Sequence, residues 1–213
     1  MLTSNDLMTL DTLPKIYDVS LSLYKDHFLS NLLPLTFYYD FTDGTKEIVK
    51  FQKLRFRHIL GIHHIDKTTT DYNIFTMIDN GLSFVHWKRN PKQKRKFVDM
   101  TDRILLFSCV FNTLRFGRVF FCPGQIVKNS PNVKLDYIVH RQISNRGLNL
   151  GLRFENNVQS PITILPSRPS DYLKYVDQSN AKIVKHLKIV EDASNTVRYD
   201  IVYTDDFIMM NTI

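Results

Sequence analysis

Histidines and arginines gather in one short stretch of the chain, from Arg55 to His64, and their types point most directly to chemistry. The stretch reads Arg-Phe-Arg-His-Ile-Leu-Gly-Ile-His-His. An imidazole such as that of His58 can take or give a proton near neutral pH, while neighbouring guanidinium groups hold a phosphate and stabilise developing negative charge. Metal-free cleavage of RNA needs this pairing. The competing interpretation is that the His58 ring packs beneath a sheet with both nitrogens satisfied.

The spacing of these histidines does not indicate a metal centre. If residues 57–64 form a helix, His58 lies about a turn and a half from His63 and His64, so the three rings need not share a face. No His-Glu-x-x-His or comparable pattern occurs. Glycine accounts for only 7 of 213 residues, none in a dinucleotide-binding or phosphate-loop spacing, which disfavours nucleotide-cradle enzymes. We therefore expect no metal and no cofactor.

A second cationic stretch, from Lys88 to Lys96, is the densest concentration of charge in the chain. Its six cations are Lys88, Arg89, Lys92, Lys94, Arg95 and Lys96. The net charge is +7, and the basic excess falls between residues 32 and 190, with acidic segments at both ends. Such a surface attracts polyanions and gains affinity by releasing phosphate counterions, so RNA is the expected partner. The alternative is a solvated loop around a helix-breaking Pro91 that only keeps the protein in solution.

The elements that position these groups follow from hydrophobic periodicity. Residues 5–32 have helical spacing, and an Asp43-Gly44 turn joins two β-rich segments, Leu35–Phe41 and Glu47–Gln52, into a hairpin. Helical periodicity returns in Tyr72–Asp79, Leu82–Arg89 and Phe97–Phe116. The strands predicted after Gly117 are Arg118–Cys122, Lys134–His140, Leu148–Phe154, Ile162–Leu165, Ala181–Val190 and Thr196–Tyr203. This order predicts an α+β fold, with N-terminal helices packed on an antiparallel β-sheet, in a single domain over residues 1–213.

Cysteine usage and the N-terminal sequence favour a reducing compartment. Cys109 and Cys122 lie thirteen residues apart in apolar segments, with no Cys-x-x-Cys pair, so we expect buried thiols rather than a disulfide. Charged residues interrupt the first thirty positions, and no apolar run reaches the roughly 18 residues of a membrane span. We expect a cytoplasmic protein without a membrane partner.

The segment Phe56-Arg57-His58-Ile59-Leu60-Gly61-Ile62, which follows a helix and a hairpin, resembles a nuclease signature. It is similar to the aromatic-x-His-Leu-Leu-Gly-hydrophobic motif of the PBECR4 group, phage-type members of the barnase/EndoU/colicin/RelE (BECR) nuclease superfamily. The later segment Pro161–Leu165, followed by Tyr172, corresponds to a Pro-x-Ser/Thr-Phe-Leu element of that group. Arg57 stands where a proline frequently precedes the histidine, and Ile164 replaces the aromatic residue.

The resemblance implies a BECR/RelE-like nuclease of toxin, phage or defence type that cleaves RNA without a metal. His58 would then be the catalytic base or acid. Further catalytic candidates, on or beside the late strands, are His140, Arg141, Arg153, Thr163 and Tyr172. Arg55 and Arg57, together with the six cations of the Lys88–Lys96 stretch, would bind the nucleic acid. An antitoxin or inhibitor protein would be a second partner.

A binding protein without catalytic activity explains the same charge distribution. In that case the basic region between residues 32 and 190 binds a nucleic-acid backbone or a protein partner, and the late-strand arginines are ordinary surface cations. A nuclease-like scaffold that has lost activity and acts as an inhibitor is a third alternative. The position of His58 bears on this choice, because catalysis requires an accessible ring beside arginines.

Overall fold

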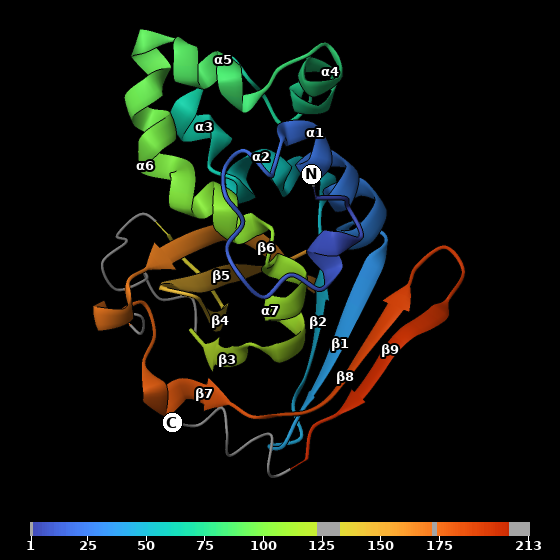
Figure 1. Ribbon diagram of the computed structural model, residues 1–213. Helices are drawn as coiled ribbons and strands as arrows, with labels where there is room; N and C mark the ends of the chain where they lie inside the picture. Colours follow the sequence, from blue (N-terminus) through green and yellow to red (C-terminus); the bar gives the residue numbers. More distant parts are fainter. Residues whose placement is uncertain (1, 123–132, 172–173, 205–213) are drawn as a thin grey trace.

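The computed structural model shows a mixed α+β protein built on one nine-stranded sheet (Figure 1). It describes residues 2–122, 133–171 and 174–204. The strands are β1 (Leu35–Phe41), β2 (Lys46–Lys50), β3 (Arg118–Phe121), β4 (Tyr137–Ile143), β5 (Arg146–Glu155), β6 (Val158–Ser167), β7 (Ala181–Lys182), β8 (Val184–Glu191) and β9 (Thr196–Val202). Their order across the sheet is β7-β3-β4-β5-β6-β2-β1-β8-β9.

One junction in the middle of the sheet differs from the rest. β2 and β6 pair in parallel, through Val49 and Gln159, whereas the other described pairings are antiparallel. The predicted antiparallel sheet is therefore correct for every pairing but this one. Beyond Gln159, β6 keeps only β5 as a strand neighbour among the described residues, because the chain leaving β2 coils into helix at Lys53. The edge of β6 that faces away from β5 is therefore not covered by a described strand beyond this point.

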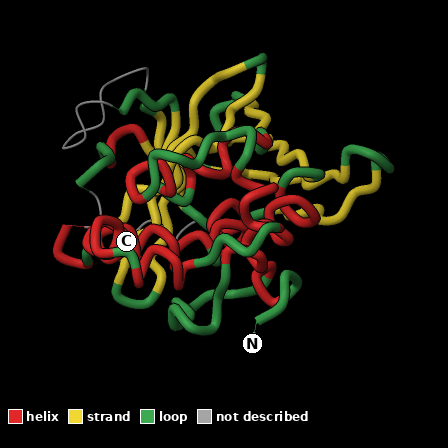
Figure 2. The backbone as a smooth tube through the Cα atoms, turned by 90° about the horizontal axis from the view of Figure 1, so that it is seen from above, coloured by secondary structure: helices red, strands yellow, loops and turns green. Residues whose placement is uncertain are grey.

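The helices lie mostly between β2 and β3 in the sequence, and Figure 2 shows most of them gathered on one side of the strands. They are α1 (Leu21–His27), α2 (Phe56–Ile59), α3 (Ile62–Ile65), α4 (Ile74–Asp79), α5 (Phe84–Arg89), α6 (Pro91–Phe107) and α7 (Val110–Phe116). The helices are therefore not confined to the N-terminus, since only α1 precedes the first strand, and α4 to α7 lie after the hairpin, where helical periodicity predicted them. Of residues 5–32, the chain coils continuously only from Leu21, where the Ser20 hydroxyl accepts a hydrogen bond from the Leu23 amide (3.0 Å).

The basic stretch is helical on both sides of Pro91 instead of forming a loop. Asn90 caps α6 by accepting a hydrogen bond from the Lys92 amide (3.0 Å), and Pro91 occupies the first helical position. Proline suits this position because its missing N–H would have no partner inside the helix. The helix predicted from Phe97 thus begins six residues earlier, and it ends at Phe107, before the turn at Ser108 and Cys109.

The hydrophobic core lies between the helices and the sheet. Aromatic residues such as Phe28, Phe56 and Phe107 pack against one another there in edge-on and tilted contacts. Trp87, which borders the basic stretch, is fully buried in this core and donates a hydrogen bond to Asp66 (3.2 Å). Both cysteines are free thiols, and burial raises the pKa of each to about 11, so they are protonated at neutral pH.

A buried histidine makes the stability of this core depend on pH. His27 is fully buried, its Nδ1 lies 3.1 Å from the Ser4 carbonyl oxygen, and burial lowers its pKa from 6.5 to about 4. The unfolded chain takes up the proton below pH 6.5 and the folded chain does so only below about 4, so stability is lost as the pH falls through this window.

We expect urea unfolding at pH 5 to show about 2 kcal/mol less stability from this ring alone than at pH 7.5. The variant His27→Leu has no ring to protonate. Its free energy of unfolding should therefore fall by about 2 kcal/mol less than that of the wild-type protein between pH 7.5 and pH 5. The same loss in the wild-type protein and the variant would show that His27 is not the titrating group.

Candidate active site

A cleft of about 570 Å³ lies beside β6 where the sheet opens. Residues of the α2–α3 segment, α6, β5 and β6 contribute to its wall. The lining residues are Arg55, His58, His63, His64, Asp99, Met100, Arg103, Val133, Arg153, Ile162, Thr163, Ile164, Leu165 and Pro166. Four residues predicted from the sequence to belong to a site, Arg55, His58, Arg153 and Thr163, therefore share one cavity although they are up to 108 positions apart (163 − 55).

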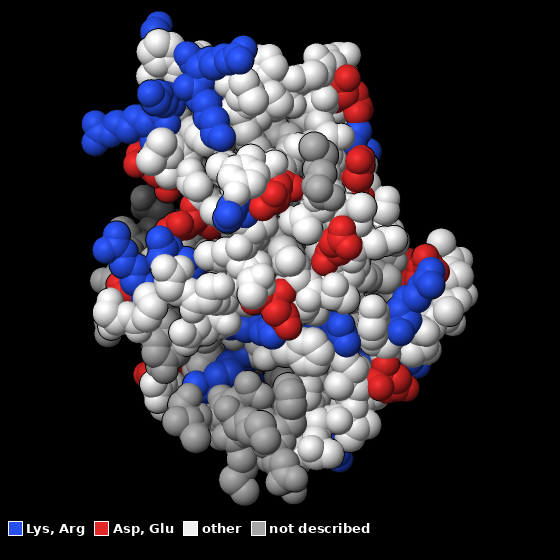
Figure 3. All heavy atoms as spheres, in the orientation of Figure 1, with Lys and Arg blue, Asp and Glu red and all other residues white. Residues whose placement is uncertain are grey.

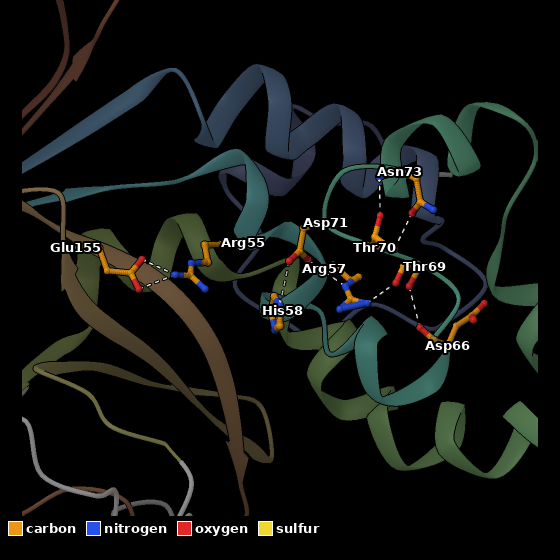
Figure 4. A network of polar contacts seen from close by, with 9 residues as sticks. All are labelled: Arg55, Arg57, His58, Asp66, Thr69, Thr70, Asp71, Asn73 and Glu155. Atoms are coloured by element: carbon orange, nitrogen blue, oxygen red, sulfur yellow. Dashed lines mark hydrogen bonds and ion pairs between the residues drawn. The ribbon is translucent and has the colours of Figure 1, made fainter.

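His58 is presented at the wall of this cleft by α2. Its side chain is 33% exposed, and Nε2 lies 3.3 Å from Oδ2 of Asp71. The other carboxylate oxygen of Asp71 accepts a hydrogen bond from Nε of Arg57 (3.0 Å), as Figure 4 shows. Within the described part of the chain, Nδ1 of His58 has no hydrogen-bond partner. The ring is accessible, oriented by a carboxylate, and retains a nitrogen for proton transfer.

The loop before α4 fixes Asp71 through hydrogen bonds of its own. The Thr69 hydroxyl donates to the Asp66 carbonyl oxygen (2.8 Å), and the Thr70 amide donates to Oδ1 of Asn73 (2.6 Å) (Figure 4). Arg57 also donates to the Thr69 carbonyl oxygen, which ties the loop to α2. Arg57 is therefore a positioning residue for Asp71 and does not line the cleft.

Gly61 brings the three histidines to one side. It separates α2 from α3 with a left-handed backbone (φ +73°), and the resulting bend places the His58 and His63 rings 4.4 Å apart and the His63 and His64 rings 3.9 Å apart. A straight helix would have kept them apart, as the sequence suggested. Burial, aided by the cations nearby, lowers the pKa of His63 to about 3 and also lowers the pKa of His64, so His63 is neutral at neutral pH.

Arg103 is the site residue that the sequence analysis missed. It lies on α6 at 8% exposure, where Nε donates to the Ile164 carbonyl oxygen (2.7 Å) and Nη2 donates to the Thr163 hydroxyl. Burial lowers its pKa to about 10, which leaves it charged at neutral pH. No carboxylate pairs with it in the described part of the chain. A buried charge without a counterion is costly, and an anion in the cleft would offset that cost.

Arg55 and Arg153 extend the cationic wall. Nη2 of Arg55 donates to both carboxylate oxygens of Glu155 (2.6 and 2.7 Å), which holds the arginine against β5. Arg153 donates through Nε and Nη2 to the Lys134 carbonyl oxygen (3.2 and 2.9 Å), an uncharged partner. With Arg103, three arginines and one carboxylate, Asp99, line the cleft, so its wall attracts anions.

Two late-strand candidates lie outside this wall. His140 is almost fully buried, with Nδ1 2.9 Å from Oδ1 of Asn149, and burial lowers its pKa. Arg141 donates to Oδ1 of Asp11 (2.9 Å) and lies over the Phe116 ring. Neither residue lines the cleft, because strand alternation and the position of β4 turn them elsewhere. Tyr172 lies outside the described residues.

The six cations of the Lys88–Lys96 stretch form a surface that we call the basic patch. All six are exposed at the end of α5 and the start of α6, where lysine and arginine gather at the top left of Figure 3. None of them forms an ion pair with a carboxylate of the described chain. The patch is free to bind an external polyanion.

A substitution at Gly61 tests how closely the α2–α3 segment packs against Arg103 of α6. A Cβ at this position would lie 2.8 Å from Cδ and 2.9 Å from Nη1 of Arg103, whereas a Cβ at Gly44, also left-handed (φ +83°), would meet nothing within 4 Å. Both alanine variants share a backbone cost of about 1–2 kcal/mol. We expect Gly61→Ala to lose about 1–3 kcal/mol more than Gly44→Ala in urea unfolding, because overpacking is added. Equal losses would contradict the close approach of Gly61 and Arg103.

Neither a search for metal-binding side chains nor comparison with known proteins assigns a function to this cleft. Among the described residues, no group of three histidine, cysteine, aspartate or glutamate side chains is arranged to hold a metal ion. No helix within the described part of the chain is long and apolar enough to cross a membrane. A scan against protein-family models, a search of the curated proteins and a search of the solved structures each found no match to this chain.

Proposed function

We propose that this protein is a metal-independent endoribonuclease whose active site is the cleft beside β6. One observation carries the proposal: an accessible His58, oriented by Asp71, lines the same cavity as a buried Arg103 that has no carboxylate partner among the described residues. The first supplies a base and the second a site for a phosphate, two of the requirements of RNA cleavage by the ribose 2′-hydroxyl; the third is a proton for the leaving 5′-oxygen.

The reaction follows from these positions. His58 takes the proton of the 2′-hydroxyl, the 2′-oxygen attacks the adjacent phosphorus, and the bond from phosphorus to the 5′-oxygen breaks. Solvent water protonates the leaving oxygen, because His63 is held neutral by its low pKa. The products are a 2′,3′-cyclic phosphate and a 5′-hydroxyl. Asp71 stabilises the imidazolium that forms, and Arg103 stabilises the charge on the pentavalent phosphorus.

Thr163 assists in this scheme as a positioning residue. Its hydroxyl accepts a hydrogen bond from Nη2 of Arg103, and the Ile164 carbonyl oxygen fixes Nε, so the guanidinium group is held by two partners on β6. The remaining amino group, Nη1, has no partner in the described chain and is left for the phosphate. Arg55 and Arg153 add positive potential at the same wall.

The scheme agrees with what the BECR resemblance implies for a histidine placed after a helix and a hairpin. RNA as substrate, a role in toxin, phage or defence settings, an antitoxin or inhibitor as partner, and a cytoplasmic location belong to the proposal. The α+β architecture and the position of His58 in α2 support it.

A second candidate function is a nucleic-acid-binding protein without catalysis. The observation in its favour is the basic patch, whose six cations are exposed, form no ion pair in the described chain and lie outside the cleft lining. Such a patch binds a polyanion whether or not His58 reacts. The inhibitor alternative shares this observation.

Incubation of the purified chain with end-labelled single-stranded RNA in excess chelator separates the two functions. Our proposal predicts cleavage that persists in chelator and spares the same strand made of DNA, which lacks the 2′-hydroxyl. Intact RNA that is nevertheless bound, with an affinity that falls as salt increases, would support the binding function and refute the nuclease.

A further inference from the structure

We infer that the substrate is single-stranded RNA that lies along one face of α6, from the basic patch to the cleft. This inference rests on the proposed function. It names the part of the basic patch that contacts the substrate, Lys92 and Lys96, and the residue at which the strand enters the cleft, Arg103.

The geometry of α6 places these three residues on one face. Lys92 precedes Arg103 by eleven residues and Lys96 precedes it by seven, which correspond to about three turns and two turns of an α-helix. The span from Lys92 to Arg103 is therefore roughly 16 Å along the helix axis. Lys92 and Lys96 are exposed and form no ion pair in the described chain, so this face carries two exposed cations at its outer end and Arg103 in the cleft, with the carboxylate of Asp99 between Lys96 and Arg103.

The depth of the cleft favours a single strand over a duplex. Arg103 is only 8% exposed, and it is reached through a cavity of about 570 Å³ rather than from a flat surface. A strand in a duplex is held rigidly to its partner, whereas an unpaired strand can turn its phosphate and its base separately into a pocket. The 2′-hydroxyl of an unpaired nucleotide can also rotate into line with the breaking bond.

The cleft wall offers little to distinguish one base from another. Its apolar members include Met100, Ile162 and Pro166, and none of the described lining residues is a phenylalanine, tyrosine or tryptophan. Asp99, one turn before Arg103, is exposed on the cleft wall, and it repels phosphate groups from the middle of this face of α6. Contacts to phosphate at Lys96 and Arg103 therefore provide affinity, and we expect weak sequence preference.

Two neighbouring lysines provide a matched test. Lys94 precedes Arg103 by nine residues, about two and a half turns, so it lies on the opposite face of α6 from Lys96. Both side chains belong to exposed residues, and both variants, Lys96→Glu and Lys94→Glu, change the charge by the same amount. Binding is measured by fluorescence anisotropy with a single-stranded 2′-O-methyl RNA, which the protein cannot cleave, and circular dichroism checks that each variant folds.

We expect Lys96→Glu to weaken binding about tenfold or more and to reduce the salt dependence by roughly one phosphate contact. Lys94→Glu should weaken binding less than about threefold, because it changes only the long-range potential. A blunt 2′-O-methyl duplex of the same length should bind the wild-type protein at least about tenfold more weakly than the single strand. Equal losses in the two variants, or a duplex that binds as well as the single strand, would overturn the inference.

Cleavage of unmodified RNA, measured in parallel, keeps this inference separate from the proposed function. RNA that is cleaved while the two lysine variants behave alike would refute the path along α6 and leave the nuclease standing. Binding that depends on the face of α6, with RNA left intact by the wild-type protein, would support the path and refute the nuclease.

Discussion

Replacement of His58 by alanine is expected to lower the rate of RNA cleavage by about a thousandfold, within the range of a lost general base. The affinity for non-cleavable 2′-O-methyl RNA should change less than about threefold, because phosphate contacts from arginines and lysines hold the strand. The reason for the large kinetic effect is geometric. His58 is the cleft histidine that is held by a carboxylate, Asp71, at 3.3 Å.

Two further variants make this expectation specific. Asp71→Asn retains an oxygen that can accept the hydrogen bond from Arg57 but loses the negative charge that stabilises an imidazolium, so we expect a loss of about 10- to 100-fold in rate. His186→Ala removes a histidine on β8, outside the cleft, and should cleave RNA at the wild-type rate. Wild-type activity in His58→Ala, or an equal loss in His186→Ala, would contradict the role of His58.

Replacement of Arg103 by methionine should lower the cleavage rate by about 100- to 1,000-fold, the usual loss when a donor to the developing negative charge is removed. Methionine keeps much of the side-chain volume but removes the charge and the hydrogen bonds to Thr163 and Ile164. Unlike the loss of His58, this loss should be accompanied by weaker binding of 2′-O-methyl RNA. Cleavage by Arg103→Met at the wild-type rate would contradict the placement of the phosphate.

Inorganic phosphate provides a second readout of Arg103 that does not depend on cleavage. A ligand that binds only the folded state at 100 times its Kd adds about 2.7 kcal/mol to the free energy of unfolding. We expect about 100 mM phosphate to stabilise the wild-type protein by up to this amount, on the assumption of a Kd near 1 mM. We expect an anion site there because Arg103 is buried without a carboxylate partner in the described chain.

The matched control is Arg198→Met, which removes an exposed arginine on β9. It should keep the phosphate-induced increase in stability, measured as the difference in thermal unfolding with phosphate and with chloride at equal ionic strength. Arg103→Met should lose that increase. If both variants retain it, phosphate binds elsewhere, and the cleft lacks the anion site that the proposed reaction requires.

Local sequence patterns were sufficient to predict most of the strands. The hairpin of Leu35–Phe41 is found as β1 and β2 around Gly44, which adopts the positive φ that an Asp-Gly turn favours. The late strands also occur near their predicted bounds, because alternating polar and apolar residues report directly on a half-buried strand. The parallel pairing of β2 with β6 could not be predicted, since it joins segments more than a hundred residues apart.

The site was predicted only in part. His58, Arg55, Arg153 and Thr163 do meet in one cleft, but the approach of His58 to His63 depends on the left-handed backbone of Gly61, which helical spacing alone does not reveal. A sequence motif specifies residue types, whereas the close approach of Gly61 to Arg103 on α6 is visible only in the folded chain.

Arg103 shows why a residue of the candidate site cannot be recognised from local sequence alone. Asp99 precedes it by four positions in a helix, a spacing that ordinarily indicates an exposed ion pair. In the folded protein the arginine instead turns toward β6 and donates hydrogen bonds to Thr163 and Ile164, about 60 residues away. Tertiary packing therefore overrides the local pairing of Arg103 with Asp99.

The chemical ends left on cleaved RNA test the central claim most directly. A single-stranded RNA incubated with the wild-type protein in excess chelator should yield, by mass spectrometry, one fragment ending in a 2′,3′-cyclic phosphate and a second beginning with a 5′-hydroxyl. Neither product should form with His58→Ala. RNA that stays intact, or fragments that carry a 3′-hydroxyl and a 5′-phosphate, would contradict attack by the ribose 2′-hydroxyl in this cleft.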